Sequence, residues 1–142
     1  MNTTPTSTAT ISFAIECATR RRIAVFRGSV GDRDLYDAYE ALLNDPTYDA
    51  SLDDLIDLRG VTHMGVTGAG LHRLIALYDD RPSDGFRTRA AIIAPTDVLY
   101  GVSRMFQTLR GEDTPDQVEV FRTPDEALRW LDRCDLGSPA AT

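Results

Sequence analysis

The stretch from residue 54 to residue 78, DLIDLRGVTHMGVTGAGLHRLIALY, constrains the fold more than any other part of this chain. It begins with an apolar run, 55–58, between acidic residues and Gly60, which is typical of a strand covered on both faces. After a glycine-bearing segment, apolar side chains recur at helical spacing: Leu71, Leu74, Ile75 and Tyr78. We therefore expect a buried strand, a loop and an amphipathic helix in direct succession.

The glycines of this loop suggest several kinds of site. Gly65, Gly68 and Gly70 permit a tight turn and close backbone approach, and Thr67 stands where its hydroxyl can cap the helix. The free N–H groups of a helix start suit a phosphate or carboxylate. No Gly-Lys-Ser/Thr follows, and the chain contains no lysine, so a Walker phosphate loop is excluded. The glycines also do not follow the G-x-G-x-x-G order, and a capped strand-to-helix turn is the plainest interpretation.

The rest of the chain predicts one α/β domain with a mixed, mostly parallel five-stranded sheet and about four helices. The expected strands are 11–17, 22–28, 54–58, 89–94 and 117–121. The expected helices are 32–44, 67–80, 97–109 and 124–134, the last two capped by Thr96 and Thr123. The first two strands are close enough for an N-terminal hairpin turning at 19–21. Each later strand follows a helix, which favours parallel pairing.

The segment MGVTGAGL, residues 64–71, resembles the M-D-S-S-G-L-G segment of STAS domains, the group named for sulfate transporters and anti-sigma factor antagonists. Asp57-Leu58 with Val61 is similar to the D-L-x-x-V strand end of that group, and 30–35 is similar to its V-T-x-x-E-L helix start. The run 97–106 and the ending VFRTPDEALRWL resemble the SpoIIAA-like branch of bacterial proteins. These uncharacterised proteins are related in fold to CRAL-TRIO domains.

The resemblance implies a non-enzymatic regulatory domain that acts through protein contacts. In anti-sigma factor antagonists the phosphoacceptor serine corresponds to Val66 here, and the preceding aspartate corresponds to Gly65. Valine has no hydroxyl, so a kinase switch cannot operate at that position, and we interpret the neighbouring threonine as a cap rather than a phosphorylation site. The expected interaction surface is the loop and the exposed helix face: Gly65, Val66, Thr67, Gly68, His72 and Arg73, with Asp79 further along.

The relation to CRAL-TRIO domains implies an alternative, the binding or carriage of a small apolar molecule in a cavity. The helix expected at 97–109 has a wider apolar surface than one stripe requires, and two tyrosines could supply polar tips at a pocket mouth. The expected pocket residues are Tyr78, Tyr100, Val102, Met105 and Phe106. Gly101 inside that helix hints at looseness, because glycine there costs about 1 kcal/mol relative to alanine.

Enzymatic and metal sites are weaker hypotheses. Asp57, His63 and Thr67 are candidates for a nucleophile, base and orienter at the end of a central strand, but no G-x-S-x-G elbow is present. His63 and His72 would need carboxylates from elsewhere to hold zinc, and Cys17 and Cys134 are too few for a disulfide framework. We expect no catalytic residue, no metal and no cofactor.

Composition limits the partners and the cell compartment. The chain has 142 residues and a net charge of −7, which fits one domain at 11–135 between flexible tails at 1–10 and 136–142 and disfavours nucleic-acid binding. No apolar run is long enough for an integral membrane segment, so we expect a cytoplasmic protein. The basic run 20–22 is interpreted as a solvated turn. The partner is an unknown protein or a small apolar molecule, and a homodimer stays open.

Overall fold

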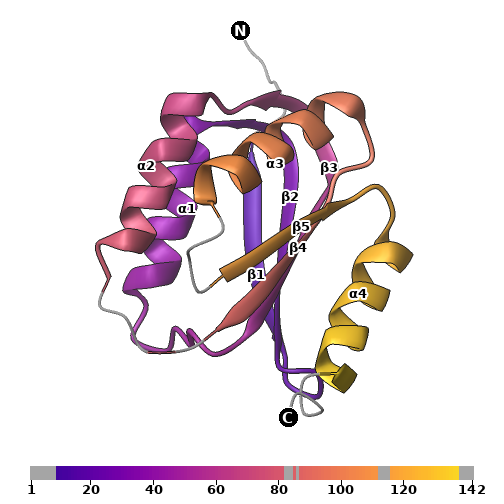
Figure 1. The fold of residues 1–142 in the computed structure, drawn as a ribbon. Coiled ribbons are helices and arrows are strands. Elements are labelled where there is room, and N and C mark those ends of the chain that lie inside the picture. Colours follow the sequence, from indigo (N-terminus) through magenta and orange to yellow (C-terminus); the bar gives the residue numbers. More distant parts are fainter. Residues whose placement is uncertain (1–8, 82–84, 86, 112–115, 138–142) are drawn as a thin grey trace, which may run out of the picture.

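The computed structural model of the chain describes residues 9–81, 85, 87–111 and 116–137. Its strands are β1 (Thr10–Glu16), β2 (Arg21–Gly31), β3 (Asp53–Gly65), β4 (Thr88–Ile93) and β5 (Asp116–Phe121). Its helices are α1 (Asp32–Asn44), α2 (Gly68–Asp79), α3 (Asp97–Arg110) and α4 (Pro124–Gly137). Every predicted element is present in the predicted order (Figure 1). Of the predicted tails, Thr10 belongs to β1 and the segment up to Gly137 belongs to α4, while 1–8 and 138–142 lie outside the described residues.

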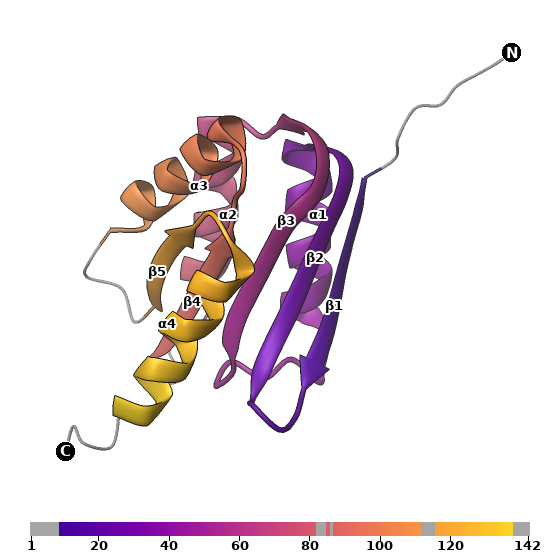
Figure 2. The same cartoon turned by 90° about the vertical axis from the view of Figure 1, so that its right-hand side faces the viewer.

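The five strands lie in the sheet in the same order as in the chain, β1-β2-β3-β4-β5. The first two form an antiparallel hairpin, and all later neighbours pair in parallel. The parallel connections all step in the same direction across the sheet. Because such crossovers share one hand, their helices α1, α2 and α3 cover the same face, called here the three-helix face. Figure 2 shows α4 alone on the opposite face, called here the α4 face, over β4 and β5.

Each face of the sheet has its own core. On the three-helix face, strand residues such as Phe26, Leu58 and Ile92 pack against Leu35 of α1 and Leu74 of α2. A smaller cluster on the α4 face contains Leu55, Ala91, Ile93, Ala127 and Leu131. Strand residues alternate between the two clusters, as the two-residue side-chain period of a strand requires. Within the described part of the chain, no helix is both long and apolar enough to cross a membrane.

The glycine-bearing loop is shorter than the sequence predicts. We expected a strand at 54–58 followed by a loop, but β3 continues through Gly65, and only Val66 and Thr67 separate it from α2. The second half of β3 runs past the end of β4 and pairs with β2 alone, where residues 27–31 lie opposite 60–65. Two register shifts interrupt this pairing. The extension brings the end of β3 over the three-helix face, beside the start of α2.

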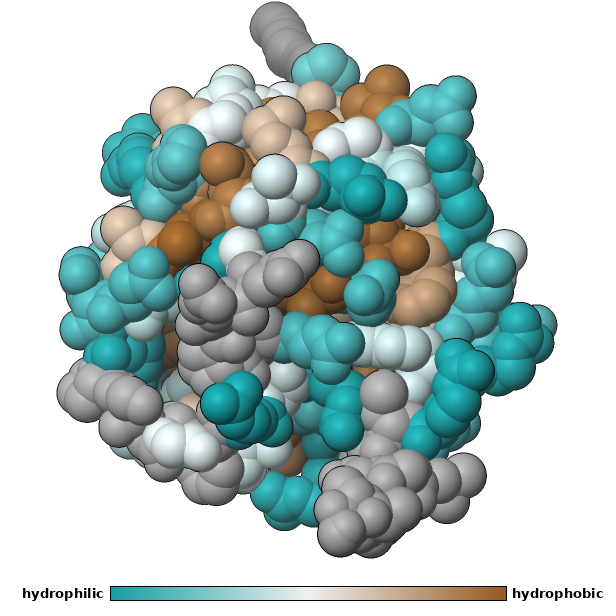
Figure 3. Space-filling model, viewed as in Figure 1, coloured by the Kyte–Doolittle hydropathy of each residue, from teal (hydrophilic) through white to brown (hydrophobic). Residues whose placement is uncertain are grey.

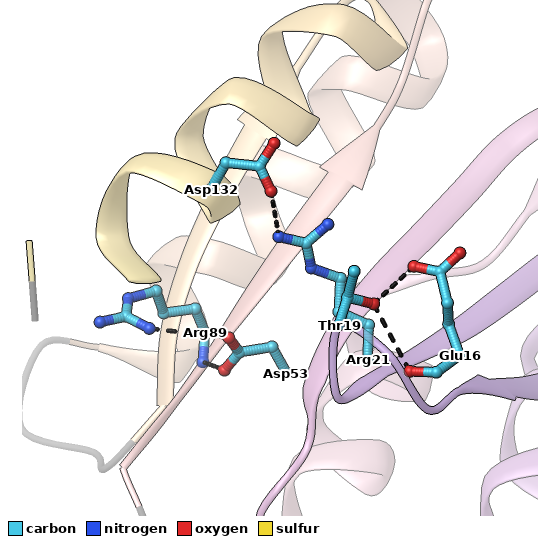
Figure 4. Close-up of polar contacts among 6 residues, drawn as sticks. All are labelled: Glu16, Thr19, Arg21, Asp53, Arg89 and Asp132. Carbon is cyan, nitrogen blue, oxygen red and sulfur yellow. Dashed lines mark hydrogen bonds and ion pairs between the residues drawn. The ribbon is translucent and has the colours of Figure 1, made fainter. Parts of the chain in front are cut away.

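The prediction of a solvated arginine turn is wrong for two of its three residues. The turn occupies 17–20, and Arg20 is exposed with a positive φ of 56°. Arg21 and Arg22 begin β2, and each is only 3% exposed. Figure 4 shows the Arg21 guanidinium reaching Asp132 on α4, with a hydrogen bond between them. Arg22 points to the other face, so these two side chains anchor opposite layers.

Nearby polar contacts complete this corner of the sheet. The Asp53 carboxylate accepts from the backbone N–H of Arg89 at 2.9 Å and forms an ion pair with its guanidinium at 3.6 Å (Figure 4). The Thr19 hydroxyl bonds to Glu16 across the hairpin turn. These contacts join the hairpin, β3, β4 and α4 at the end of the sheet where the parallel strands begin.

Candidate functional site

A cavity of about 350 Å³ lies between the sheet and the helices of the three-helix face. Strands β2 to β5 form its floor, α1, α2 and α3 form its walls, and Tyr48 with its neighbours lines one end. Figure 3 shows hydrophobic side chains at the surface between α2 and α3. Mostly apolar cavities of roughly 300–1,000 Å³ are the usual sites for small molecules, which makes this the candidate site.

Side chains at regular helical spacing form the walls of the cavity, and small side chains leave its interior unfilled. Leu35 and Tyr39 lie four residues apart on α1 and line the cavity together, and Val102 and Phe106 do the same from α3. Ser103 of α3 is buried and also lines the cavity, facing a floor that includes Ala90 of β4. Larger side chains at these two positions would fill part of the space.

Two tyrosines give the apolar interior a polar component. Tyr39 and Tyr78 lie with their ring centroids 6.2 Å apart, and both line the cavity. Burial raises the pKa of both phenols, and the nearby carboxylate of Asp54 adds to the rise. Both hydroxyls are therefore neutral at physiological pH, and each can donate or accept one hydrogen bond.

The start of α2 is tied to the start of α1. The Thr67 hydroxyl accepts from the N–H of Gly70 at 3.2 Å, which confirms the predicted cap. The Asp32 carboxylate accepts from both the Thr67 N–H at 2.7 Å and the Thr67 hydroxyl at 2.6 Å. A Cβ on Gly70 would lie 2.0 Å from the Asp32 carboxylate, so only glycine permits this approach. The Thr67 hydroxyl is engaged as both donor and acceptor.

The residues predicted to contact a protein fall into two groups. Gly65 ends β3, and Val66 lies half-buried and lines the cavity instead of facing solvent. Gly68 begins α2, where a Cβ would lie 3.7 Å from the Met105 sulfur. His72 and Arg73 are exposed on α2, and the Arg73 guanidinium lies 4.6 Å from the centre of the Tyr36 ring on α1. An exposed surface therefore exists on α2, whereas in the segment before it Val66 lines the cavity between the exposed residues Gly65 and Thr67.

The residues predicted to line a pocket also divide. Tyr78, Val102 and Phe106 line the cavity, whereas Met105 is 40% exposed and lies outside its lining. The Tyr100 ring lies 4.3 Å from the Arg122 guanidinium and is not part of the lining. The lining residues of α1 were not predicted from the sequence. Their signal was present, because Leu35, Tyr39 and Leu43 repeat every four residues on one helix face and are all buried.

The candidate catalytic residues do not come together. Asp57 and His63 lie on the same extended strand, six residues and therefore roughly 20 Å apart. Both carboxylate oxygens of Asp57 accept from the Arg59 guanidinium, at 3.0 and 2.8 Å, and Thr67 is bonded to Asp32. The hydrogen bond from Arg59 lowers the pKa of Asp57. Across the described ranges, no three or more His, Cys, Asp or Glu side chains are placed to hold a metal ion.

Comparison with known proteins identifies the fold. No family model matches the chain, and no curated protein matches it either. An uncharacterized protein of the DUF3478 family from Shewanella loihica PV-4, described as having a SpoIIAA-like fold, is similar with 20% identity and a TM-score of 0.57. The match covers 90% of this chain and 98% of that one. This chain has the SpoIIAA-like fold. An anti-sigma factor antagonist from Mycobacterium paratuberculosis is also similar, with 19% identity, a TM-score of 0.53, and coverage of 88% of this chain and 95% of that one.

The SpoIIAA-like fold agrees with the fold that the STAS resemblance implied, including the hairpin, the mostly parallel sheet and the four helices. Identity near 20% supports the fold and not the activity of either solved protein. Two features of this chain itself bear on its function, the cavity on the three-helix face and the exposed face of α2.

Proposed function

We propose that this chain is a non-enzymatic regulatory domain that binds one small, largely apolar molecule in the cavity on its three-helix face. The observation that carries the proposal is the cavity itself, about 350 Å³ of mostly apolar space inside the larger of the two cores. A dry apolar cavity of roughly 150 Å³ already binds benzene or xenon in an engineered protein. The cavity here has more than twice that volume.

Energetics favour an occupied cavity. At ~24 cal/mol per Å³, an enclosed empty cavity of about 350 Å³ would cost about 8 kcal/mol. This value is an upper bound because the cavity is partly open to solvent, so water can occupy part of it. A bound molecule restores the missing van der Waals contacts and removes much of this cost. Ligand binding would thereby stabilise the fold and could report the presence of the ligand.

The test uses a neutral apolar fluorophore, N-phenyl-naphthylamine, titrated into the purified protein. We expect saturable fluorescence enhancement in the unmodified chain and a large loss of binding in Ala90→Leu, which fills the floor of the cavity. Ala41→Leu, the same change at an exposed position of α1, is the matched control and should bind like the unmodified chain. Equal binding by all three proteins, or binding by none, would refute a ligand in this cavity.

A second candidate function is a protein contact through the exposed face of α2. It is favoured by the exposure of His72 and Arg73 and by the likeness to a protein described as an anti-sigma factor antagonist. Such a contact would not depend on phosphorylation, because Val66 has no hydroxyl and the Thr67 hydroxyl already bonds to Asp32. Phosphate on Thr67 would bring negative charge against that carboxylate.

Affinity capture with charge-reversal variants tests this second function. Arg73→Glu should abolish capture of a partner by the α2 face, and Thr67→Ala should leave it largely intact. Arg33→Glu is the control, because Arg33 is also exposed but lies on α1. If Arg73→Glu and Arg33→Glu capture the same proteins in the same amounts, the α2 face is not the contact surface.

A further inference from the structure

The cavity is polar at one end and apolar at the other. Its four charged lining residues are Asp54, Asp79, Arg81 and Arg110. Asp54 lies at the start of β3, and the other three lie at the ends of α2 and α3 or directly after them. All four therefore lie at the end of the sheet where the parallel strands begin. The opposite end is lined by apolar side chains, including Met64 and Val66 where β3 ends. This polarity suits a ligand with one polar head and an apolar tail.

Three guanidinium groups lie at or beside the polar end, those of Arg81 and Arg110 in the lining and that of Arg22 next to Asp54. The Arg22 and Arg81 guanidinium carbons lie 4.7 and 5.3 Å from the centre of the Tyr48 ring, and that of Arg110 lies 5.8 Å from the centre of the Tyr78 ring. Cations therefore already lie over these two aromatic faces, where an amine head group would otherwise bind. The tyrosines at this end do not form an open cage for a second cation.

The two carboxylates at this end are each paired with one of these arginines. Asp54 lies 3.5 Å from Arg22, and Asp79 lies 3.0 Å from Arg110. The third guanidinium belongs to Arg81, which donates from Nη1 to the carbonyl oxygen of Leu43 at 2.6 Å. A guanidinium carries five N–H donors in a planar fork, so Arg81 retains donors for a bound anion at the polar end of the cavity.

We propose that the ligand is an amphipathic monocarboxylate whose head binds Arg81 and whose tail extends towards Met64 and Val66. This inference rests on the proposed ligand-binding function and specifies its chemical class. A carboxylate matches the guanidinium fork with two parallel hydrogen bonds, which an alcohol or amine cannot reproduce. At ~30 Å³ for each water-sized group, about 350 Å³ holds roughly a dozen non-hydrogen atoms. A straight-chain acid such as decanoate has this size.

The test compares three ligands with the same tail: decanoate, decanol and decylamine. Each is titrated against the N-phenyl-naphthylamine complex of the unmodified chain, of Arg81→Met and of Arg104→Met. Arg104 is the matched control, since it is an exposed arginine of α3 that does not line the cavity. We expect decanoate to bind most tightly, and Arg81→Met to weaken decanoate by about 10-fold or more, the effect of losing a charged hydrogen bond. Decanol binding should be unchanged in Arg81→Met, and Arg104→Met should behave like the unmodified chain.

The outcomes separate this inference from the proposed function. If decanol or decylamine binds at least as tightly as decanoate, the carboxylate head is refuted while the apolar cavity stands. An equal loss of decanoate and decanol in Arg81→Met would also refute it, because Arg81 would then shape the cavity rather than bind the head. If the fluorophore itself does not bind the unmodified chain, so that no ligand can displace it, the proposed ligand-binding function fails as well.

Discussion

Filling the cavity gives the sharpest prediction about stability. Leucine at position 90 adds three carbons to a side chain that faces the cavity from the middle layer of the fold. At ~0.8 kcal/mol for each buried methylene group, the transfer gain is about 2.4 kcal/mol. Ordering the leucine side chain costs ~0.5–1 kcal/mol, which leaves a net gain of about 1.5 kcal/mol for the ligand-free protein. Urea denaturation followed by circular dichroism measures this change as a higher midpoint with an unchanged slope.

The neighbouring alanine provides the control for this experiment. Ala91 points to the α4 face, where it is fully buried against Ile93, Ala127 and Leu131. Leucine there overpacks a filled core, and we expect Ala91→Leu to lose ~1–3 kcal/mol. The two substitutions are chemically identical and adjacent on one strand, yet their expected effects on the free energy of unfolding have opposite signs. If Ala90→Leu destabilises the protein as Ala91→Leu does, the cavity does not offer the space described here.

Three further measurements test other parts of the structure. Gly70→Ala should lower the free energy of unfolding by ~1–3 kcal/mol, because its Cβ would overlap a carboxylate of α1. Gly68→Ala should be nearly neutral. Thermal unfolding compares the two variants, and equal effects on stability would contradict this geometry. Burial raises the pKa of Tyr39 and Tyr78, so their folded forms favour the neutral phenol and stability falls as pH rises above about 10. Tyrosinate absorbance should show these two ionising only on alkaline unfolding, and simultaneous ionisation of all five tyrosines would oppose the prediction. The hydrogen bond from Arg59 lowers the pKa of Asp57, so the ionised carboxylate stabilises the fold above about pH 4 and this stabilisation is lost as the pH falls. Asp57→Asn should therefore make the acid-unfolding transition less steep.

The local features of the fold could be predicted from the sequence. Thr67, Thr96 and Thr123 each accept from an N–H three residues further along, at the positions predicted for the caps. A cap depends on residues within one helical turn, so a single sequence contains the whole signal. The same holds for the alternation of strands and helices, which fixed the expected pairing of the parallel strands.

Features that depend on distant residues could not be predicted in this way. Residues 59–65 contain two glycines and mixed polarity, which is typical of a loop, but pairing with β2 extends the strand through them. The run of arginines indicated a solvated turn because it falls at the expected tip of the hairpin. Its partners lie elsewhere: Asp132 for Arg21, and Asp54 with the Asp49 carbonyl for Arg22.

The candidate site likewise has features that could be predicted from the sequence and features that could not. The apolar surface of α3 indicated a cavity in this region, and two of its residues, Val102 and Phe106, do line it. The sequence did not indicate the contribution of α1 or the position of Arg81 at the polar end of the cavity. Both depend on how three helices are spaced over one face of the sheet, and the periodicity of a single helix carries no information about that spacing.

The identity of strand order and chain order has a consequence for how the protein is made. Each parallel strand pairs with the strand synthesised just before it, as Asp53 of β3 does with Arg21 of β2, so no pairing in the sheet waits for a strand from a more distant part of the chain. A chain emerging from the ribosome can therefore extend its sheet one edge strand at a time. The hydrogen bond between Arg21 and Asp132 spans 111 residues and forms only when α4 is complete. It joins the hairpin to α4, so it can form only after all five strands of the sheet have been synthesised.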